Sequence, residues 1–132
     1  MNYLLDTHAF LWAAFAPAKL SAKARQAIRS ADNSISVSTI SFGEIALKYG
    51  LGKIELEGCL PDELPAVAEA MRIDIISPTA QEMASFHQLP RQAHKDPFDR
   101  MLVWQAIRAS QVLISRDGSL SGYRELGLCL LW

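Results

Sequence analysis

Acidic residues in this sequence follow two of its short apolar runs. Asp6 comes directly after residues 3–5, and Asp117 comes shortly after residues 112–115. If these runs are parallel strands, their carboxyl ends meet at one edge of a sheet, which is where ligand sites of such sheets lie. Further acids stand in the first turns of helices expected beside that edge: Glu44, Asp96 and Asp99. We therefore expect acids from four places in the chain to gather at one site.

Crowded carboxylates repel one another unless a cation neutralises them. Magnesium suits such a site because it takes oxygen ligands and is held by few carboxylates together with waters. A metal of this kind lowers the pKa of a bound water and stabilises charge on a phosphodiester, so no nucleophilic serine or cysteine is required. We expect Asp6 and Asp99 to be direct ligands. Glu44 and Asp117 would complete the shell through water or orient the attacking water.

Each acid also has a purely structural interpretation. Glu44 follows Ser41 by three residues, which is the pattern of a capping box. Asp96 precedes Pro97, as an N-cap precedes the first helical residue. Asp99 would stand favourably near the same helix N-terminus, and Asp117-Gly118 is a turn signal. These interpretations serve each residue alone, but they do not explain why the acids converge on one edge.

The elements that must position these acids alternate along the chain. Strands are expected at 3–5, 35–38, 73–76, 112–115 and 128–132. Helices are expected at 8–15, from Ser21 to about 31, from Ser41 to about 50 or 52, at 61–72, from Thr79 to before Pro90, and from Asp96 with apolar positions Phe98, Leu102, Ala106 and Ala109. Short apolar strands separated by helices predict an α/β fold, a three-layer α/β/α arrangement around a mostly parallel sheet.

Size and composition limit the class of protein. The 132 residues predict one domain, 1–132, and the apolar fraction of 50% supplies a core. No apolar run reaches the roughly 18 residues of a membrane span, and the first residues lack the basic region of a signal peptide. Cys59 and Cys129 lack the spacing of metal ligands. We therefore expect a cytoplasmic protein in which both cysteines are reduced. The net charge of −1 argues against binding nucleic acid by bulk charge, so any such binding must be local.

Other chemically active residues carry weaker signals. His87 and His94 could pair on zinc, but no third soft ligand is evident. Trp12 and Trp104 fit a core better than a base-stacking surface. Several cations flank the acids and either steer phosphate or belong to the solvated surface: Lys48, Lys53, Lys95, Arg100 and Arg116.

Four segments in order resemble one family. They are Leu4-Leu5-Asp6-Thr7-His8, then Ser38-Thr39-Ile40-Ser41-Phe42-Gly43-Glu44-Ile45-Ala46, then His94-Lys95-Asp96-Pro97-Phe98-Asp99-Arg100, and then Ile114-Ser115-Arg116-Asp117. Each motif is weak alone, but together they are similar to the ordered motifs of VapC-type toxins, which are PIN-domain ribonucleases.

The resemblance implies an RNA-cleaving enzyme that uses Mg²⁺ or Mn²⁺. It places the catalytic and metal-binding acids at Asp6, Glu44, Asp99 and Asp117. It places supporting residues at Thr7, Asp96 and Ser115. It also implies a homodimer and a small antitoxin partner whose C-terminal segment covers the cleft.

Two other hypotheses come from different classes. A receiver-like phosphorelay domain also carries acids at strand ends, but it needs a phosphoacceptor acid after a central strand and a lysine after a late one. The third and fourth strands here end in Ser77-Pro78 and Ser115-Arg116 instead. The alternative closer to the main hypothesis is a catalytically silent PIN-like module that binds protein or RNA. The intact set of acids argues against it.

Overall fold

A computed structural model describes residues 1–91 and 94–132. Its centre is a five-stranded sheet in which every neighbouring pair is parallel, with the order β3-β2-β1-β4-β5. The strands are β1 (Asn2–Leu5), β2 (Ser34–Ser38), β3 (Asp74–Ile76), β4 (Val112–Ile114) and β5 (Cys129–Leu131). The predicted α/β class and parallel sheet are confirmed.

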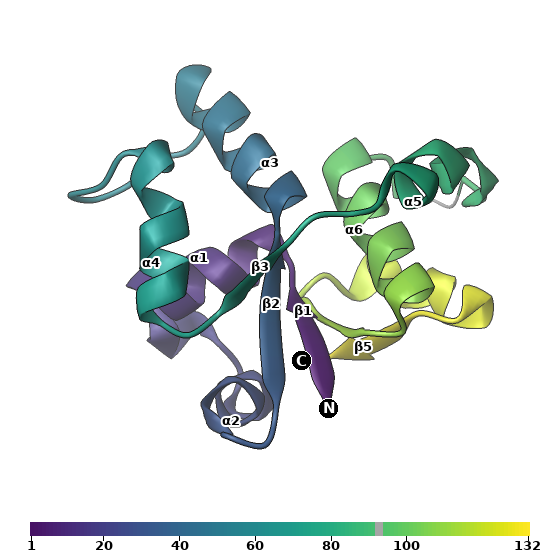
Figure 1. The fold of residues 1–132 in the computed structure, drawn as a ribbon, viewed down its shortest axis with the longest axis horizontal. Coiled ribbons are helices and arrows are strands. Elements are labelled where there is room, and N and C mark those ends of the chain that lie inside the picture. Colours follow the sequence, from purple (N-terminus) through teal and green to yellow (C-terminus); the bar gives the residue numbers. More distant parts are fainter. Residues whose placement is uncertain (92–93) are drawn as a thin grey trace.

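Helices connect the strands. They are α1 (Thr7–Phe15), η1 (Pro17–Lys19), α2 (Ala22–Arg29), α3 (Thr39–Gly50), η2 (Pro61–Glu63), α4 (Leu64–Ala70), α5 (Ala80–Ala84), η3 (Ser85–Gln88), α6 (Pro97–Ala109) and η4 (Gly118–Leu126), where η marks a 3₁₀ helix. In Figure 1, α1, α2 and α4 lie to one side of the central strands, and α5 and α6 lie to the other. No helix among the described residues is both long and apolar enough to cross a membrane.

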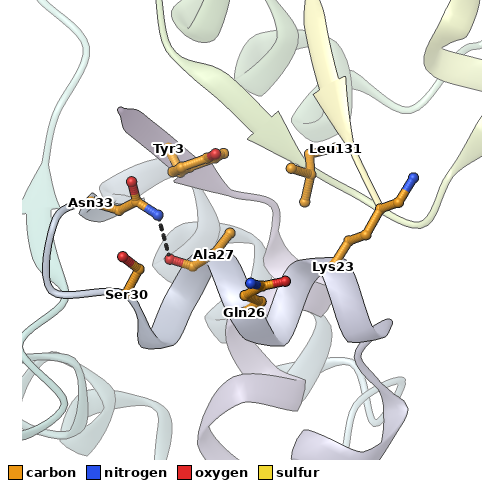
Figure 2. A pocket seen from close by; sticks show the side chains of 7 residues that line it. All are labelled: Tyr3, Lys23, Gln26, Ala27, Ser30, Asn33 and Leu131. Carbon is orange, nitrogen blue, oxygen red and sulfur yellow. Dashed lines mark hydrogen bonds between the residues drawn. The ribbon is translucent and has the colours of Figure 1, made fainter.

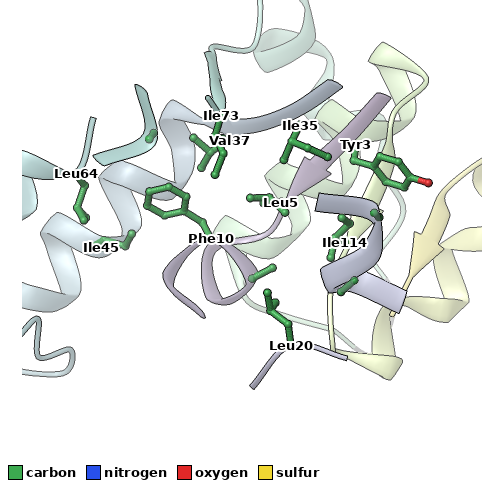
Figure 3. Close-up of a cluster of buried hydrophobic side chains, with 14 residues drawn as sticks. Tyr3, Leu5, Phe10, Leu20, Ile35, Val37, Ile45, Leu64, Ile73 and Ile114 are labelled. Carbon is green, nitrogen blue, oxygen red and sulfur yellow. The ribbon is translucent and has the colours of Figure 1, made fainter. Parts of the chain in front are cut away.

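Two apolar clusters cover the two faces of the sheet. Leu5 packs with Phe10 and Ile45 in the cluster that joins α1 to α4 (Figure 3). Its neighbour Leu4 points to the other face, where it packs with Leu102 of α6 and Tyr123 of η4. This alternation is the two-residue period of a strand, so β1 is buried on both faces. The strand is therefore a rigid support for the residue that follows it.

Several local expectations need correction. The capping box at Ser41 is wrong, because α3 begins directly after β2 and the Ser38 hydroxyl already accepts from the Ile40 amide. Glu44 consequently lies in the second helical turn, not the first. Ala109 does not extend the apolar stripe of α6, since it is exposed near the helix end, and Val103 is buried instead. The helix expected at 61–72 is divided into η2 and α4, and no element was expected where η4 stands.

The strand order defines where a ligand can bind. The chain moves from β1 outward through β2 to β3 on one side, and later from β4 outward to β5 on the other. Connections therefore leave β1 and β4 in opposite directions, and a crevice opens beyond their carboxyl ends. Asp6 directly follows β1, and Asp117 is the N-cap of the helix after β4.

Candidate metal centre and active site

A pocket of about 430 Å³ opens at the carboxyl ends of β1 and β4. Three of the four predicted acids line it, namely Asp6, Asp99 and Asp117. Glu44 is buried behind them, and one of its carboxylate oxygens lies within 4.8 Å of ligand atoms of Asp96 and Asp99. The structure therefore brings together all four acids that the sequence analysis selected.

Asp6 links the end of β1 to the start of α1. Its Oδ1 accepts from the Ala9 amide at 2.7 Å, so the side chain caps α1 while it faces the pocket. Burial raises the pKa of Asp6 from 3.8 to about 6, although hydrogen bonds from the Ser115 hydroxyl and the Ala9 amide oppose this, and repulsion by Asp99 adds to it. A nearby cation would relieve that unfavourable ionisation.

Glu44 is held by a buried polar network between α1 and α3. The Thr7 hydroxyl donates to Glu44 Oε1 at 2.6 Å, and the Ser41 and Thr7 hydroxyls are 2.9 Å apart. Lys48, one turn along α3, forms an ion pair with Glu44 Oε2. Glu44 is only 2% exposed, so these partners compensate a charge that would be costly to bury alone.

Asp96 and Asp99 have different local roles at the start of α6. Asp96 Oδ1 accepts from the Phe98 amide at 2.9 Å, which confirms it as the N-cap, and its Oδ2 lies 3.8 Å from Lys48 Nζ. Asp99 makes no cap and faces the pocket. Burial and the charges of Asp96 and Glu44 raise the pKa of Asp99, although the hydrogen bond with His94 opposes the rise.

Asp117 is the best solvated of the pocket acids. Its Oδ1 accepts from the Ser119 amide at 2.9 Å and from the Ser119 hydroxyl at 2.6 Å. Burial would raise the pKa of Asp117, but these two hydrogen bonds and the neighbouring His94 outweigh it, so the pKa lies below its ordinary value. Ser115 supports the same turn, because its buried hydroxyl accepts from the Asp117 amide at 3.1 Å.

His94 is the residue of this site that sequence reasoning missed. Its Nε2 lies 2.9 Å from Asp99 Oδ2, and its Nδ1 lies 2.9 Å from Ser119 Oγ and 3.4 Å from Asp117 Oδ2. The imidazole thus bridges two of the pocket acids. The available signal is its place two residues before Asp96, whereas its spacing from His87 suggests zinc instead. Supporting residues Thr7, Asp96 and Ser115 all contact members of the acid set.

The donor set fits a divalent cation. Among residues 1–91 and 94–132, two sets of side chains could each hold a cation, because the ligand atoms within each set lie within 4.8 Å of one another. One set is Glu44, Asp96 and Asp99, and the other is His94, Asp99 and Asp117. Asp99 belongs to both, and Asp6 lines the pocket without belonging to either. Oxygen atoms dominate, as hard divalent cations prefer. The fold and site together define an α/β protein with a carboxylate centre at its topological switch point.

A second pocket, of about 320 Å³, lies against α2 and the start of β1 (Figure 2). The Asn33 amide donates to the Ala27 carbonyl at 2.9 Å, and none of the described residues that line this pocket carries a carboxylate. Its lining therefore offers no site for metal chemistry, and we assign the candidate active site to the acidic pocket. The residues that line this second pocket are Tyr3, Lys23, Gln26, Ala27, Ser30, Asn33 and Leu131.

Comparisons with known proteins agree with the geometry. The PIN domain family model matches residues 3–126. The chain is 32% identical over 129 residues to the protein named Ribonuclease VapC22 of Mycobacterium tuberculosis (strain ATCC 25618 / H37Rv), covering 98% of this chain and 97% of that one. The chain therefore belongs to the PIN domain family, and its resemblance to VapC proteins is confirmed.

Two solved structures share the fold. A chain of VapBC2 from Rickettsia felis, bound to a DNA fragment from its promoter, superposes with a TM-score of 0.69 and 17% identity, covering 100% of this chain and 99% of that chain. A chain of VapBC-1 from nontypeable Haemophilus influenzae gives a TM-score of 0.62 and 17% identity, with coverages of 99% and 97%. At this identity the likeness establishes the three-layer fold.

Proposed function

We propose that residues 1–132 form a cytoplasmic, metal-dependent endoribonuclease that cleaves RNA phosphodiesters and serves as the toxin of a type II toxin–antitoxin system. The observation that carries this proposal is the convergence of Asp6, Glu44, Asp99 and Asp117 beyond the ends of β1 and β4. The relative named as a ribonuclease, similar over almost the full chain, supports the same activity.

Carboxylates from the four catalytic positions would hold Mg²⁺ or Mn²⁺. When bound, such an ion lowers the pKa of a water molecule and stabilises the charge that develops on the phosphodiester. Asp99 belongs to both groups of ligand atoms, so it is the main ligand in this proposal. Asp6, which follows the buried strand β1 and lines the same pocket, would supply a second carboxylate.

The remaining residues keep the carboxylates in place. Thr7 and Lys48 fix Glu44 through one bond to each of its oxygens. Ser119 and His94 orient Asp117 in the same way. Charged groups held by such partners need little rearrangement when a substrate arrives, and preorganised electrostatics of this kind contribute strongly to catalysis.

A small antitoxin and a second copy of the chain are the proposed protein partners. The two solved structures are described as VapBC assemblies, which supports an antitoxin for this chain too. A homodimer is proposed from the family resemblance.

The deciding experiment is cleavage of a structured RNA by the purified protein in millimolar Mg²⁺ or Mn²⁺, with EDTA as the metal-free control. Cleavage that needs the ion and is lost in Asp99→Asn supports the proposal. Asp32→Asn is a matched control, because Asp32 is an exposed acid in the turn before β2. RNA binding without cleavage in either metal would instead favour the catalytically silent module.

A further inference from the structure

The acidic pocket is also lined by aromatic and cationic side chains. Its lining includes His8 and Trp12 from α1 and Arg116 from the turn after β4, in addition to the three acids. The Arg116 guanidinium lies 5.9 Å from the centre of the Trp12 ring, and the His8 ring lies 5.6 Å from it. An aromatic surface and a cation therefore stand beside the proposed metal centre.

Trp12 differs from Trp104 in the hydrogen bonding of its indole N–H. The Trp104 indole N–H donates to the Glu82 carbonyl at 2.9 Å and lies 3.2 Å from Ser85 Oγ, which fixes that ring between α5 and α6. Within residues 1–91 and 94–132, the Trp12 indole N–H forms no hydrogen bond, and the residue is only half-buried. Trp12 packs on Trp132 from one side, with ring centres 5.8 Å apart, and also lines the pocket.

Arg116 differs in a similar way from Lys48 and Arg100, two other cations near the acids. Lys48 is paired with Glu44, and the Arg100 guanidinium donates to the Leu89 carbonyl at 3.0 Å. Arg116 is exposed and forms no ion pair within the part of the chain that the structure describes, although Asp117 is its neighbour in sequence. Its charge is therefore available to an anion that enters the pocket.

We propose that Trp12 and Arg116 form a nucleotide-binding subsite, in which the base of an unpaired RNA nucleotide next to the scissile phosphate stacks on Trp12 and its own phosphate contacts Arg116. This proposal rests on the proposed function, since it places the substrate at the same pocket. Base stacking on an aromatic ring tolerates different sequences, and arginine contacts both phosphate and aromatic faces.

The charge of the protein favours such a local subsite. The net charge is −1, so the surface as a whole does not attract a polyanion. Three carboxylates line the pocket, and they repel phosphate until a cation is bound. Base stacking contributes binding energy that does not depend on charge, so it can hold RNA at a pocket whose carboxylates repel phosphate.

Binding of a short single-stranded RNA, measured by fluorescence anisotropy in EDTA, tests the subsite together with kcat/KM for cleavage in Mg²⁺. Trp12→Leu should weaken binding by about 5- to 150-fold, the range that corresponds to the loss of one stacked base, and lower kcat/KM similarly. Trp12→Phe should retain most of the affinity. It should also lose the quenching of tryptophan fluorescence that RNA causes in the wild-type protein.

Arg116→Gln should weaken binding and reduce the slope of log affinity against log salt by about 0.7, the value for one phosphate contact on a single strand. Trp12→Leu should leave that slope unchanged. Arg108→Gln is a matched control, because Arg108 stands 5.8 Å from the Trp104 ring, does not line the pocket, and should change neither quantity.

Two results would overturn the subsite. If the wild-type protein cleaves RNA and a folded Trp12→Leu variant keeps full affinity and kcat/KM, or if RNA quenches the tryptophan fluorescence of Trp12→Phe as much as that of the wild type, the subsite is refuted while the nuclease function stands. The same holds if Trp12→Leu loses only the binding of a protein partner. If the wild-type protein neither binds nor cleaves RNA, the proposed function fails and the subsite fails with it.

Discussion

Replacing Asp6 by Asn separates its role in the site from its role in the fold. The side chain caps α1 through a 2.7 Å bond from the Ala9 amide. Asparagine caps helices as well as aspartate does, so Asp6→Asn keeps this bond while it removes the charge. Any change in stability should therefore report the ionisation of Asp6 rather than the loss of a cap.

The size of the effect follows from the raised pKa. Asp6 titrates at about 6 in the metal-free fold, compared with an ordinary value of 3.8. Because the unfolded chain releases this proton at lower pH than the folded chain, the free energy of unfolding falls as the pH rises from about 4 to about 6. Roughly two pKa units, at about 1.4 kcal/mol each, set an upper limit of about 3 kcal/mol for the loss.

Urea unfolding in EDTA at several pH values measures this loss. Asp6→Asn should equal the wild type near pH 4, gain over it through pH 6, and keep a constant advantage of up to about 3 kcal/mol above that. In a separate assay in millimolar Mg²⁺ or Mn²⁺, where the wild type cleaves RNA, Asp6→Asn should show no cleavage. The exposed control Asp32→Asn should show no such trend. A variant less stable than the wild type at pH 8, or an advantage that does not depend on pH, would refute the assigned origin of the raised pKa.

Three further predictions concern the neighbouring residues. Millimolar Mg²⁺ or Mn²⁺ should raise the melting temperature relative to EDTA, because the ion binds the folded site; no shift with either ion would contradict a metal centre. Asp96→Ser should keep most of the cleavage activity, since serine also caps helices. Asp99→Ser should abolish cleavage and change the free energy of unfolding by less than roughly 1 kcal/mol. Full activity of Asp99→Ser would exclude Asp99 as a metal ligand. Thr7→Val should lower the free energy of unfolding by about 2 kcal/mol in urea titrations, because it removes a hydrogen bond to the buried Glu44 carboxylate. An unchanged free energy of unfolding would show that the ion pair with Lys48 is enough to stabilise the buried Glu44.

The sequence predicted those parts of the site that depend on local structure. Asp6 could be placed because an apolar run ended there, and Asp96 was recognised as an N-cap because Pro97 follows it. The parallel sheet then brought Asp6, Asp99 and Asp117 to one edge by geometry alone. Such inferences succeed because strand ends and helix starts are determined by a few neighbouring residues.

Features that depend on side-chain packing between distant segments were not predictable. Ser38 and Ser41 both suit a helix start, and the choice between them depends on how far β2 pairs with β1. His94 reaches Asp117 only because α6 and η4 pack together. Trp12 was assigned to the core, and it does pack there, but its contact with the acidic pocket depends on where Arg116 and the turn after β4 lie.

Direct titration of Mn²⁺, followed by the electron paramagnetic resonance signal of the free ion, tests the central claim without reference to any substrate. The wild-type protein should remove Mn²⁺ from solution saturably, and Asp32→Asn should bind it equally well. Asp99→Asn should lose at least about tenfold in affinity, because Asp99 belongs to both groups of ligand atoms. If the wild-type protein binds no Mn²⁺, or if Asp99→Asn binds it as tightly, the carboxylates at the ends of β1 and β4 do not form a metal centre.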